Sequence, residues 1–382
     1  MRWIFLSLCF ICSLQADPSK KICLNMIVKN ESAVIRRSLT SAKPLIDYWV
    51  IVDTGSTDGT QAIIREVMKG IPGELHERPW VNFEVNRNQA MELSKSKGDY
   101  LLFIDADEEF VISDAAALAK LDQDCYLMKV HEQIDNSIDY TRALLVNNRL
   151  PWRWEGVLHE LLECPTNPTP HLLEGIKVVS RSAEGARAKD PNKYLNDAAV
   201  LEEALKKDPN NSRYTFYLAQ SYLNAKEYAK SLKNYQKRAK MGGFDEEVFI
   251  SLYVSGHLQE KLGLLSELFI DSYWKAYHAR PTRAEPLYRL ADHYKRAGYP
   301  LMSYLLSSYA LSIPFPSSDV LFTEPWVYEW GLLVNTGETG AVIGKNREAL
   351  QALEAAITRP SLPEETRLAE EKNIQTLKER LR

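Results

Sequence analysis

The chain has few cysteines, no long hydrophobic run and no excess of positive charge. Only 5 of its 382 residues are cysteines, and Cys23, Cys125 and Cys164 show no metal-ligand or disulfide spacing. We therefore expect neither a disulfide framework nor a zinc site. The formal net charge is −4, so no basic surplus is available to neutralise a phosphate backbone, and we expect no nucleic-acid partner.

Residues 1–16 have the pattern of a signal peptide. Arg2 gives a positive start, an apolar run from Trp3 to Leu14 follows, and Ala16 offers a small residue for cleavage. A run of this length is too short to cross a bilayer, so we expect no stable membrane span. Cleavage predicts secretory or periplasmic routing, whereas a cytoplasmic protein would keep this segment as a buried first helix or strand.

The length and the apolar pattern predict more than one domain. At 382 residues the chain exceeds the usual size of a single core, and a hydrophobic fraction of 45% is typical of folded proteins. Near residue 190 the pattern changes from short alternating runs to helical spacing alone. We predict an α/β domain over residues 21–190, helical repeats over residues 191–345 and charged capping helices over residues 346–382.

In the first domain, short apolar runs alternate with amphipathic stretches, which is typical of βαβ units around a mostly parallel sheet. The predicted strands are residues 22–28, 48–52, 75–78 and 100–104. The predicted helices are residues 31–41, 57–68 and 86–95. Strand-like sequence continues over residues 126–161, and the proline-rich residues 164–170 are expected to form a loop.

The second domain contains an internal repeat. Tyr214–Tyr222 resembles the first helix of a tetratricopeptide repeat, whose period is about 34 residues. A second copy surrounds Ala291, which lies two periods beyond Ala219, and Ser251–Tyr277 leaves room for a degenerate copy between them. Stacked repeats of this kind form an all-α solenoid, with a plain helical bundle as the alternative.

A solenoid of this kind would offer a groove for an extended or helical segment. The side chains expected to line it are Tyr214, Tyr217, Gln220 and Asn224. The alternative is that Tyr217 and Leu218 belong to the helical core.

Polar residues follow three of the predicted strands. They are Asn30, Glu31, Asp53, Asp105 and Asp107. In an open α/β sheet, ligands bind outside the carboxyl ends of the strands, so we expect these residues around one solvent-facing cleft. The Asp-x-Asp spacing suits a divalent cation that prefers oxygen ligands, and such an ion can neutralise a departing diphosphate.

Four segments, in this order, resemble the successive motifs of family 2 glycosyltransferases. They are Ile27–Glu31, Ile51–Thr60, Asn86–Asn88 and Gly98–Glu108. The resemblance implies the GT-A-like nucleotide-diphospho-sugar transferase fold and a nucleotide sugar as donor. It places the nucleotide site at Asn30, Glu31, Asp53, Thr54, Gly55, Arg87, Asn88, Asp105 and Ala106, with Asp53 on the base and Asp105 also in catalysis. Thr54 stands where the family often has a second acid, so the identity of the base stays open.

The segment Trp152–Glu160 adds a second resemblance. It is similar to the tryptophan-to-His-Glu segment of lipooligosaccharide-core glucosyltransferases and of bacteriocin cysteine S-glycosyltransferases, the latter also carrying tetratricopeptide-like helices. In those enzymes the histidine completes the metal site. The resemblance therefore implies that Asp107 and His159 hold Mn²⁺ or Mg²⁺.

Glycosyl transfer with inversion needs a carboxylate base on the acceptor side. Glu160 is our candidate, with Glu108 and Glu109 as rivals. Glu160 has a second interpretation, in which it forms a salt bridge that orients Arg153 or another basic residue.

The sequence therefore predicts a metal-dependent glycosyltransferase whose repeats hold a protein, peptide or glycan acceptor. An alternative is a repeat-based interaction scaffold with an inactive transferase domain. A nucleotidyltransferase is disfavoured, because it would need a glycine-rich phosphate loop after the first strand, and Val28–Glu31 contains no glycine.

Overall fold

The computed structural model describes residues 20–133 and 138–382. The predicted signal peptide, residues 1–16, lies outside the described residues. The chain divides into two compact units, Met1–Pro191 and Asn192–Arg382. Each unit has its own hydrophobic core and is described separately.

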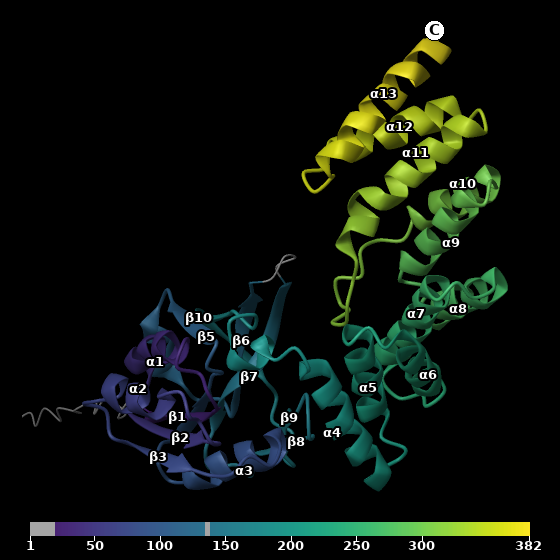
Figure 1. Cartoon of the computed structure of the whole chain (residues 1–382). Coiled ribbons are helices and arrows are strands. Elements are labelled where there is room, and N and C mark those ends of the chain that lie inside the picture. Colours follow the sequence, from purple (N-terminus) through teal and green to yellow (C-terminus); the bar gives the residue numbers. More distant parts are fainter. Residues whose placement is uncertain (1–19, 134–137) are drawn as a thin grey trace, which may run out of the picture. The chain divides into compact units, whose positions relative to one another are not determined.

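The first unit is built on an eight-stranded sheet (Figure 1) with the strand order β3-β2-β1-β4-β7-β6-β10-β5. Its strands are β1 (Ile22–Val28), β2 (Tyr48–Asp53), β3 (Gly73–Glu77), β4 (Tyr100–Phe103), β5 (Glu108–Ile112), β6 (Cys125–Glu132), β7 (Ile138–Asn147) and β10 (His171–Ser180). Strand β7 pairs antiparallel with β4 and β6, and β5 pairs antiparallel with β10. The other neighbouring pairs are parallel. The predicted mostly parallel α/β class is confirmed.

Three helices flank the purely parallel half of this sheet. They are α1 (Ile35–Ala42), α2 (Thr60–Val67) and α3 (Phe83–Leu93). In Figure 1, α1 and α2 lie on one side of strands β1–β3, and α3 lies on the other side. The chain moves outward from β1 to β3 and then returns through α3 to β4, which lies on the other side of β1. Strands β1 and β4 therefore flank a point where the strand order reverses, which is where such sheets bind ligands.

The predicted elements of this half exist, with shifted ends. The helix predicted over residues 57–68 begins at Thr60, because Gly59 has a left-handed backbone (φ 92°) and the Asp58 carboxylate accepts a hydrogen bond from the Thr60 amide. The helix predicted over residues 86–95 begins earlier, at Phe83, since Asn82 caps it by accepting from the Val85 amide.

The sequence analysis did not predict β5 or β10. Strand β5 contains the acidic residues Glu108 and Glu109, which weaken the apolar signal of a strand. Strand β10 has an irregular burial pattern without strict alternation, and it follows a proline-rich loop. A separate small sheet pairs β8 (Arg153–Glu155) with β9 (Leu161–Glu163). Short helical turns are η1 (Lys43–Leu45), η2 (Ala115–Lys120) and η3 (Ala186–Lys189).

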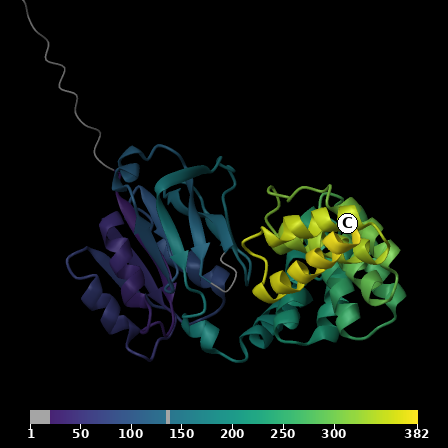
Figure 2. The same ribbon diagram turned by 90° about the horizontal axis from the view of Figure 1, so that it is seen from above.

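The second unit contains only helices in its regular structure, as predicted. They are α4 (Lys193–Lys207), α5 (Ser212–Asn224), α6 (Tyr228–Ala239), α7 (Asp245–Lys261), α8 (Ser266–Ala279), α9 (Glu285–Arg296), α10 (Pro300–Ala310), η4 (Val327–Gly331), α11 (Leu332–Val342), α12 (Asn346–Ile357) and α13 (Glu364–Arg380). Each helix packs chiefly on its neighbours in the sequence. Figure 2 views the stack from above, with the C-terminal helices drawn over the earlier ones.

Small residues let these helices pack closely. Ala219 in α5 and Ala291 in α9, the two positions that revealed the repeat, are fully buried. The degenerate copy expected between them is the pair α7 and α8. Within that pair, a Cβ on Gly256 would lie 2.7 Å from the ring of Tyr273, so only glycine fits at this contact.

No helix in the described part of the chain is long and apolar enough to cross a membrane.

The Gly256 contact yields a prediction of stability. Gly256→Ala should lower the melting temperature, because overpacking against Tyr273 costs about 1–3 kcal/mol, and alanine's higher helix propensity returns only about 1 kcal/mol. The measurement is thermal unfolding followed by circular dichroism. Ala229→Gly, at an exposed position of α6, measures the propensity effect without a packing change. A melting temperature of Gly256→Ala at or above that of the wild type would contradict the close contact.

Candidate functional site

The site lies where β1, β2 and β4 end. Asn30 and Glu31 follow β1, Asp53 ends β2, and Asp105 follows β4. The register of the parallel ladders brings the carboxyl ends of these strands to one edge of the sheet. The topology thus gathers the residues that the sequence analysis placed at three separate strand ends.

Asn30 and Asp53 hold the loops after β1 and β2 together. The Asn30 amide donates to Ser56 Oγ at 2.8 Å, and its side-chain oxygen accepts from the Thr57 amide at 2.8 Å. Asp53 Oδ1 accepts from the amides of Gly55 and Ser56, both at 2.7 Å. Gly55 has a φ of 109°, a conformation that glycine adopts readily. These contacts fix the backbone of the loop.

Asp53 is fully buried, which corrects the expectation that its side chain faces solvent. Its Oδ1 is used by the loop, whereas Oδ2 is buried with no hydrogen-bond partner among the described residues. A buried acceptor without a donor is costly, and a ligand N–H would satisfy it. Neighbouring Thr54 is also buried, and its hydroxyl donates to the Val28 carbonyl at 3.1 Å. Thr54 therefore joins β2 to β1 at the position where the family often has a second acid.

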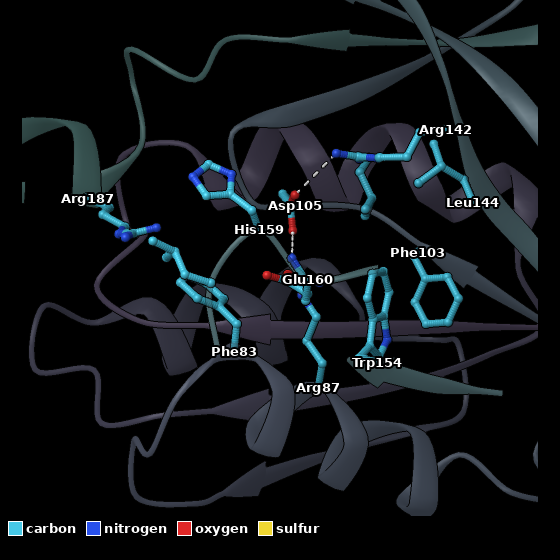
Figure 3. Close-up of a pocket in the computed structure, with 12 residues that line it drawn as sticks. Phe83, Arg87, Phe103, Asp105, Arg142, Leu144, Trp154, His159, Glu160 and Arg187 are labelled. Atoms are coloured by element: carbon cyan, nitrogen blue, oxygen red, sulfur yellow. Dashed lines mark hydrogen bonds and ion pairs between the residues drawn. The ribbon is translucent and has the colours of Figure 1, made fainter. Parts of the chain in front are cut away.

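A cavity of about 260 Å³ lies at the end of β4. It is lined by Phe83, Arg87, Phe103, Ile104, Asp105, Arg142, Leu144, Trp154, Leu158, His159, Glu160 and Arg187. Figure 3 shows the charged side chains converging between an aromatic wall and His159. Four predicted site residues, Arg87, Asp105, His159 and Glu160, therefore meet in one cavity although they come from distant parts of the sequence.

Arg87 is the central cation of the cavity. Its Nη2 donates to Asp105 Oδ1 at 2.7 Å, and its Nε donates to Glu160 Oε1 at 2.6 Å. Its guanidinium group also lies over the ring of Trp154, 4.9 Å from the centroid. Glu160 thus orients a basic residue, as one interpretation predicted, but the partner is Arg87. Arg153 pairs with Glu155 instead.

A second arginine, Arg142 of β7, faces the same acids. Its Nη1 lies 3.6 Å from Asp105 Oδ2, and its Nη2 donates to Glu108 Oε2 at 2.6 Å. Burial alone would raise the pKa of Asp105, but Arg87 and Arg142 outweigh burial and lower it. Both oxygens of Asp105 therefore face an arginine. Glu108, one of the rival bases, is itself buried.

Asp107 lies apart from the cavity lining, in an acidic environment. Burial is the largest cause that raises the pKa of Asp107 to about 7, and the charges of Asp105, Glu108 and Glu31 add to it. A cation at this position would relieve the repulsion among these carboxylates. The segment after β10 covers Asp107, and a Cβ on Gly185 would lie 2.5 Å from Asp107 Oδ2.

Glu31 meets the same covering segment. Its Oε2 accepts from the Ala186 amide at 3.1 Å. Burial raises the pKa of Glu31, and this amide bond partly counteracts the rise. Arg187 continues the segment into the cavity, where its guanidinium group lies 4.9 Å from the centre of the Phe83 ring. Residues 181–189 therefore connect the acidic cluster with the cavity.

Asn88 holds the segment that carries His159 and Glu160. Its Nδ2 donates to the Trp154 carbonyl at 2.8 Å, and its Oδ1 accepts from the Trp154 amide at 2.9 Å. The side chain of Asn88 thus pairs with a backbone in the way a strand would. The turn that follows contains Gly156 (φ 114°) and His159 (φ 54°), which aims the histidine into the cavity.

Residues 23–184 match the sequence model of the family described as "Glycosyl transferase family 2". This part of the chain is a family 2 glycosyltransferase domain. The match ends within residues 181–189, so the site lies inside it except for Gly185, Ala186 and Arg187.

Several known proteins resemble parts of the chain. The "TPR repeat-containing protein Synpcc7942_0270" of Synechococcus elongatus is 32% identical over 149 residues, which are 37% of this chain and 36% of that protein. The SPbeta prophage-derived glycosyltransferase SunS of Bacillus subtilis is 24% identical over 241 residues, which are 58% of this chain and 56% of SunS. The chain thus spans about a third to about half of the length of these relatives.

The crystal structure of MamA has 17% sequence identity and a TM-score of 0.37, and the match covers 47% of this chain and 94% of MamA.

Three polar or aromatic residues of the cavity lie outside the motifs found in the sequence. They are Phe83, Arg142 and Arg187. A signal for Arg142 existed, since an arginine beside the buried run Leu144–Val146 of β7 requires an acidic partner. Phe83 and Arg187 meet only through the fold, and no local pattern marks either of them.

Among the described residues of the glycosyltransferase domain, side chains alone do not complete a metal site. Within residues 20–133 and 138–382, no group of three His, Cys, Asp or Glu side chains is arranged to hold an ion. Asp107 and His159 are thus too few by themselves, and an ion held by them would need oxygen atoms from a ligand or water. That they share one ion stays a prediction.

Arg142 should contribute to stability through Glu108. Arg142→Met leaves the Glu108 carboxylate buried without its cation, so we expect the free energy of unfolding to fall by about 3 kcal/mol. Adding Glu108→Gln removes the unpaired charge and should restore more than half of that loss. Denaturant unfolding of the wild type, the two single variants and the double variant measures the coupling. Additive effects in this cycle would show that the pair is not energetically linked.

Proposed function

We propose that the protein is a metal-dependent glycosyltransferase that moves a sugar from a nucleotide-diphosphate donor to a protein, peptide or glycan acceptor, with inversion. The observation that carries the proposal is the cavity in which Arg87 joins Asp105 to Glu160 beside His159. This cavity lies at the strand-order reversal of a family 2 glycosyltransferase domain. The alternative, a scaffold with an inactive domain, does not require such an array of buried charges.

The loops after β1 and β2 are suited to the nucleotide. Asp53 Oδ2 is a buried acceptor without a partner among the described residues, and a base N–H is a matching donor. Asn30 and Gly55 shape the loop that presents it. Glu31 follows β1 and Ala106 follows β4 at the same edge of the sheet. The positive side chains of Arg87, Arg142 and Arg187 suit an anionic diphosphate.

A divalent cation fits the residues beside this cavity. Asp107 would hold it from the acidic cluster that includes Glu31, and His159 would add an imidazole ligand. Oxygen ligands suit Mg²⁺ or Mn²⁺, and the added nitrogen favours Mn²⁺. When bound, such an ion would neutralise charge that develops on the departing diphosphate.

Glu160 is the group that would accept the proton of the acceptor. Its side chain is 11% exposed, and Arg87 donates to Oε1, which fixes the direction of the carboxylate. Asp105 on the other side of Arg87 keeps the guanidinium group in place. The rivals are less suitable, since Glu160 lines the cavity whereas Glu108 and Glu109 are not among its lining residues. Inversion follows from a base on the face opposite the leaving group.

The helical repeats would supply a surface for the acceptor or a partner. In α5, Tyr214, Tyr217 and Gln220 are half-buried and Asn224 is exposed, so the side chains expected in a groove are accessible at least in part. Phe216 and Ala219 of the same helix belong to the core, and the ring of Tyr217 also packs against it.

The proposal is tested by release of nucleoside diphosphate from a panel of nucleotide sugars in the presence of Mn²⁺, with Glu160→Gln beside the wild type. Glutamine keeps an acceptor for Arg87 but cannot take a proton, so turnover should fall by about 10²–10⁴-fold while donor affinity changes little. Glu163→Gln, on exposed β9, is the matched control and should retain activity. If the wild type releases nucleoside diphosphate from none of the donors, the proposed function is wrong. If Glu160→Gln keeps full activity, Glu160 is not the base and only orients Arg87.

A second prediction concerns the cation. A chelator should abolish turnover, and Mn²⁺ should restore it better than Mg²⁺. His159→Ala should raise the Mn²⁺ concentration for half activity by about tenfold or more, as the loss of one ligand would. His171→Ala, an exposed histidine of β10, is the control and should leave the Mn²⁺ requirement unchanged. A wild-type Mn²⁺ requirement in His159→Ala would exclude His159 as a ligand.

A further inference from the structure

The second unit contains one long connection, which is irregular over residues 311–324 and becomes helical at Pro325 and Trp326. Residues 311–326, which we term the connector, join α10 to η4. The other links between its helices are much shorter, such as residues 225–227 and 343–345. Irregular connections of the connector's length are uncommon in compact domains unless they have a function. Figure 1 shows the connector running back along α9 and α7 toward α5.

The repeats hold the backbone of the connector with charged side chains. Glu246, at the start of α7, accepts from the amides of Val320 at 2.9 Å and Leu321 at 2.8 Å. Arg283, just before α9, donates to the carbonyls of Leu321 at 3.2 Å and Phe322 at 3.0 Å. Contacts to amides and carbonyls do not depend on the side chains of the segment that supplies them. Any extended segment with a matching backbone path could make them.

Two acidic side chains of the connector meet a row of arginines. Asp319 accepts from Arg280 at 2.6 Å and 2.5 Å and from Arg283 at 3.2 Å. Glu324 accepts from Arg289 of α9 at 2.9 Å. These contacts do depend on the side chains, because they need a carboxylate at each of two positions.

Two apolar side chains of the connector remain largely or half exposed. Val320 is 76% exposed and Phe322 is 50% exposed. Phe322 also has a φ of 40°, a conformation that costs energy for a residue other than glycine, and its ring stacks on Phe216 of α5 with centroids 6.5 Å apart. Ile313 and Leu321 of the connector are partly buried against the core of the repeats. The connector is therefore held by its backbone and its acids in addition to this apolar packing.

We propose that the surface formed by α5, α7, α9 and the residues between α8 and α9 is a binding site for an extended acidic peptide, and that the connector occupies this site in cis. The partner is a segment with two carboxylates at the spacing of Asp319 and Glu324, which would meet the same arginines. Binding in trans requires the connector to leave. The site is thus closed by an intramolecular competitor.

The tether gives the connector a large advantage. A covalently linked segment competes at an effective concentration of about millimolar for short flexible links. Weakening the contacts of the connector, while leaving the arginines intact, should therefore expose the site. Arg283 is fully buried and also bonds Glu285, so it keeps one counter-charge when the connector loosens.

The experiment uses the full chain and a fluorescent synthetic peptide with the sequence of residues 317–326. Asp319→Asn combined with Glu324→Gln removes the two charges of the connector without changing its shape. This double variant should bind the peptide at least tenfold more tightly than the wild type, as measured by fluorescence anisotropy. A peptide with the same two positions changed to Asn and Gln is the control and should not bind.

A second variant separates displacement from unfolding. Phe322→Ala loosens the half-exposed ring and leaves both acids in place, so it should fold and also bind the acidic peptide more tightly than the wild type. Circular dichroism establishes that each variant keeps its helices. Tighter binding by a folded variant, confined to the acidic peptide, supports the proposal. If Phe322→Ala binds no better than the wild type and the double variant either does the same or unfolds, the connector is a fixed part of the fold and the proposal is overturned.

Discussion

The side chain of Arg87 is 11% exposed, and its charge lies between Asp105 and Glu160. A buried cation is stable only when carboxylates pair with it, so Arg87 determines where those two acids can point. Through Arg87, these acids connect the end of β4 with the turn after β8, which lies 55 residues later in the sequence. Strand β7, with Arg142, lies between them in the sequence. Burial alone would lower the pKa of Arg87, but Asp105 and Glu160 outweigh burial and raise it. The buried charges of the cavity are stable because each one is paired with a group of opposite charge.

The sheet provides the fixed frame for this charge array. The chain returns from β3 through α3 to β4, and Arg87 of α3 reaches Asp105 just beyond the end of β4. Asn88, the next residue of the same helix, bonds both polar groups of the Trp154 backbone. One helix therefore supplies the central cation and also holds the segment that carries its second acid. This arrangement explains how two adjacent residues of one motif can have different roles.

The helical unit uses buried arginine in a comparable way. Arg283 is fully buried, bonds Glu285 and reaches two carbonyls and one carboxylate of the connector. An irregular segment cannot satisfy its backbone groups through its own hydrogen bonds, so it must find partners on the surface that it crosses. Charged side chains at the ends of α7 and α9 provide them. In the first unit buried charge shapes a cavity, and in the second it holds a chain segment.

The sequence by itself determined the α/β and all-α classes, the strands that end at Asp53 and Asp105, the repeat copies at Ala219 and Ala291, and the family of the first domain. These features depend on local periodicity and on motifs of neighbouring residues, which a sequence records directly. Strands β5 and β10 were missed because acids, prolines and mixed burial hide their alternation. Only the tertiary structure decided that Asp53 is buried, that Arg142 and Arg187 reach the cavity, and that residues 311–326 cross the repeats. Each of these features depends on contacts between residues far apart in sequence. Pairing a buried charge or backbone group with such a distant partner leaves no pattern among neighbouring residues.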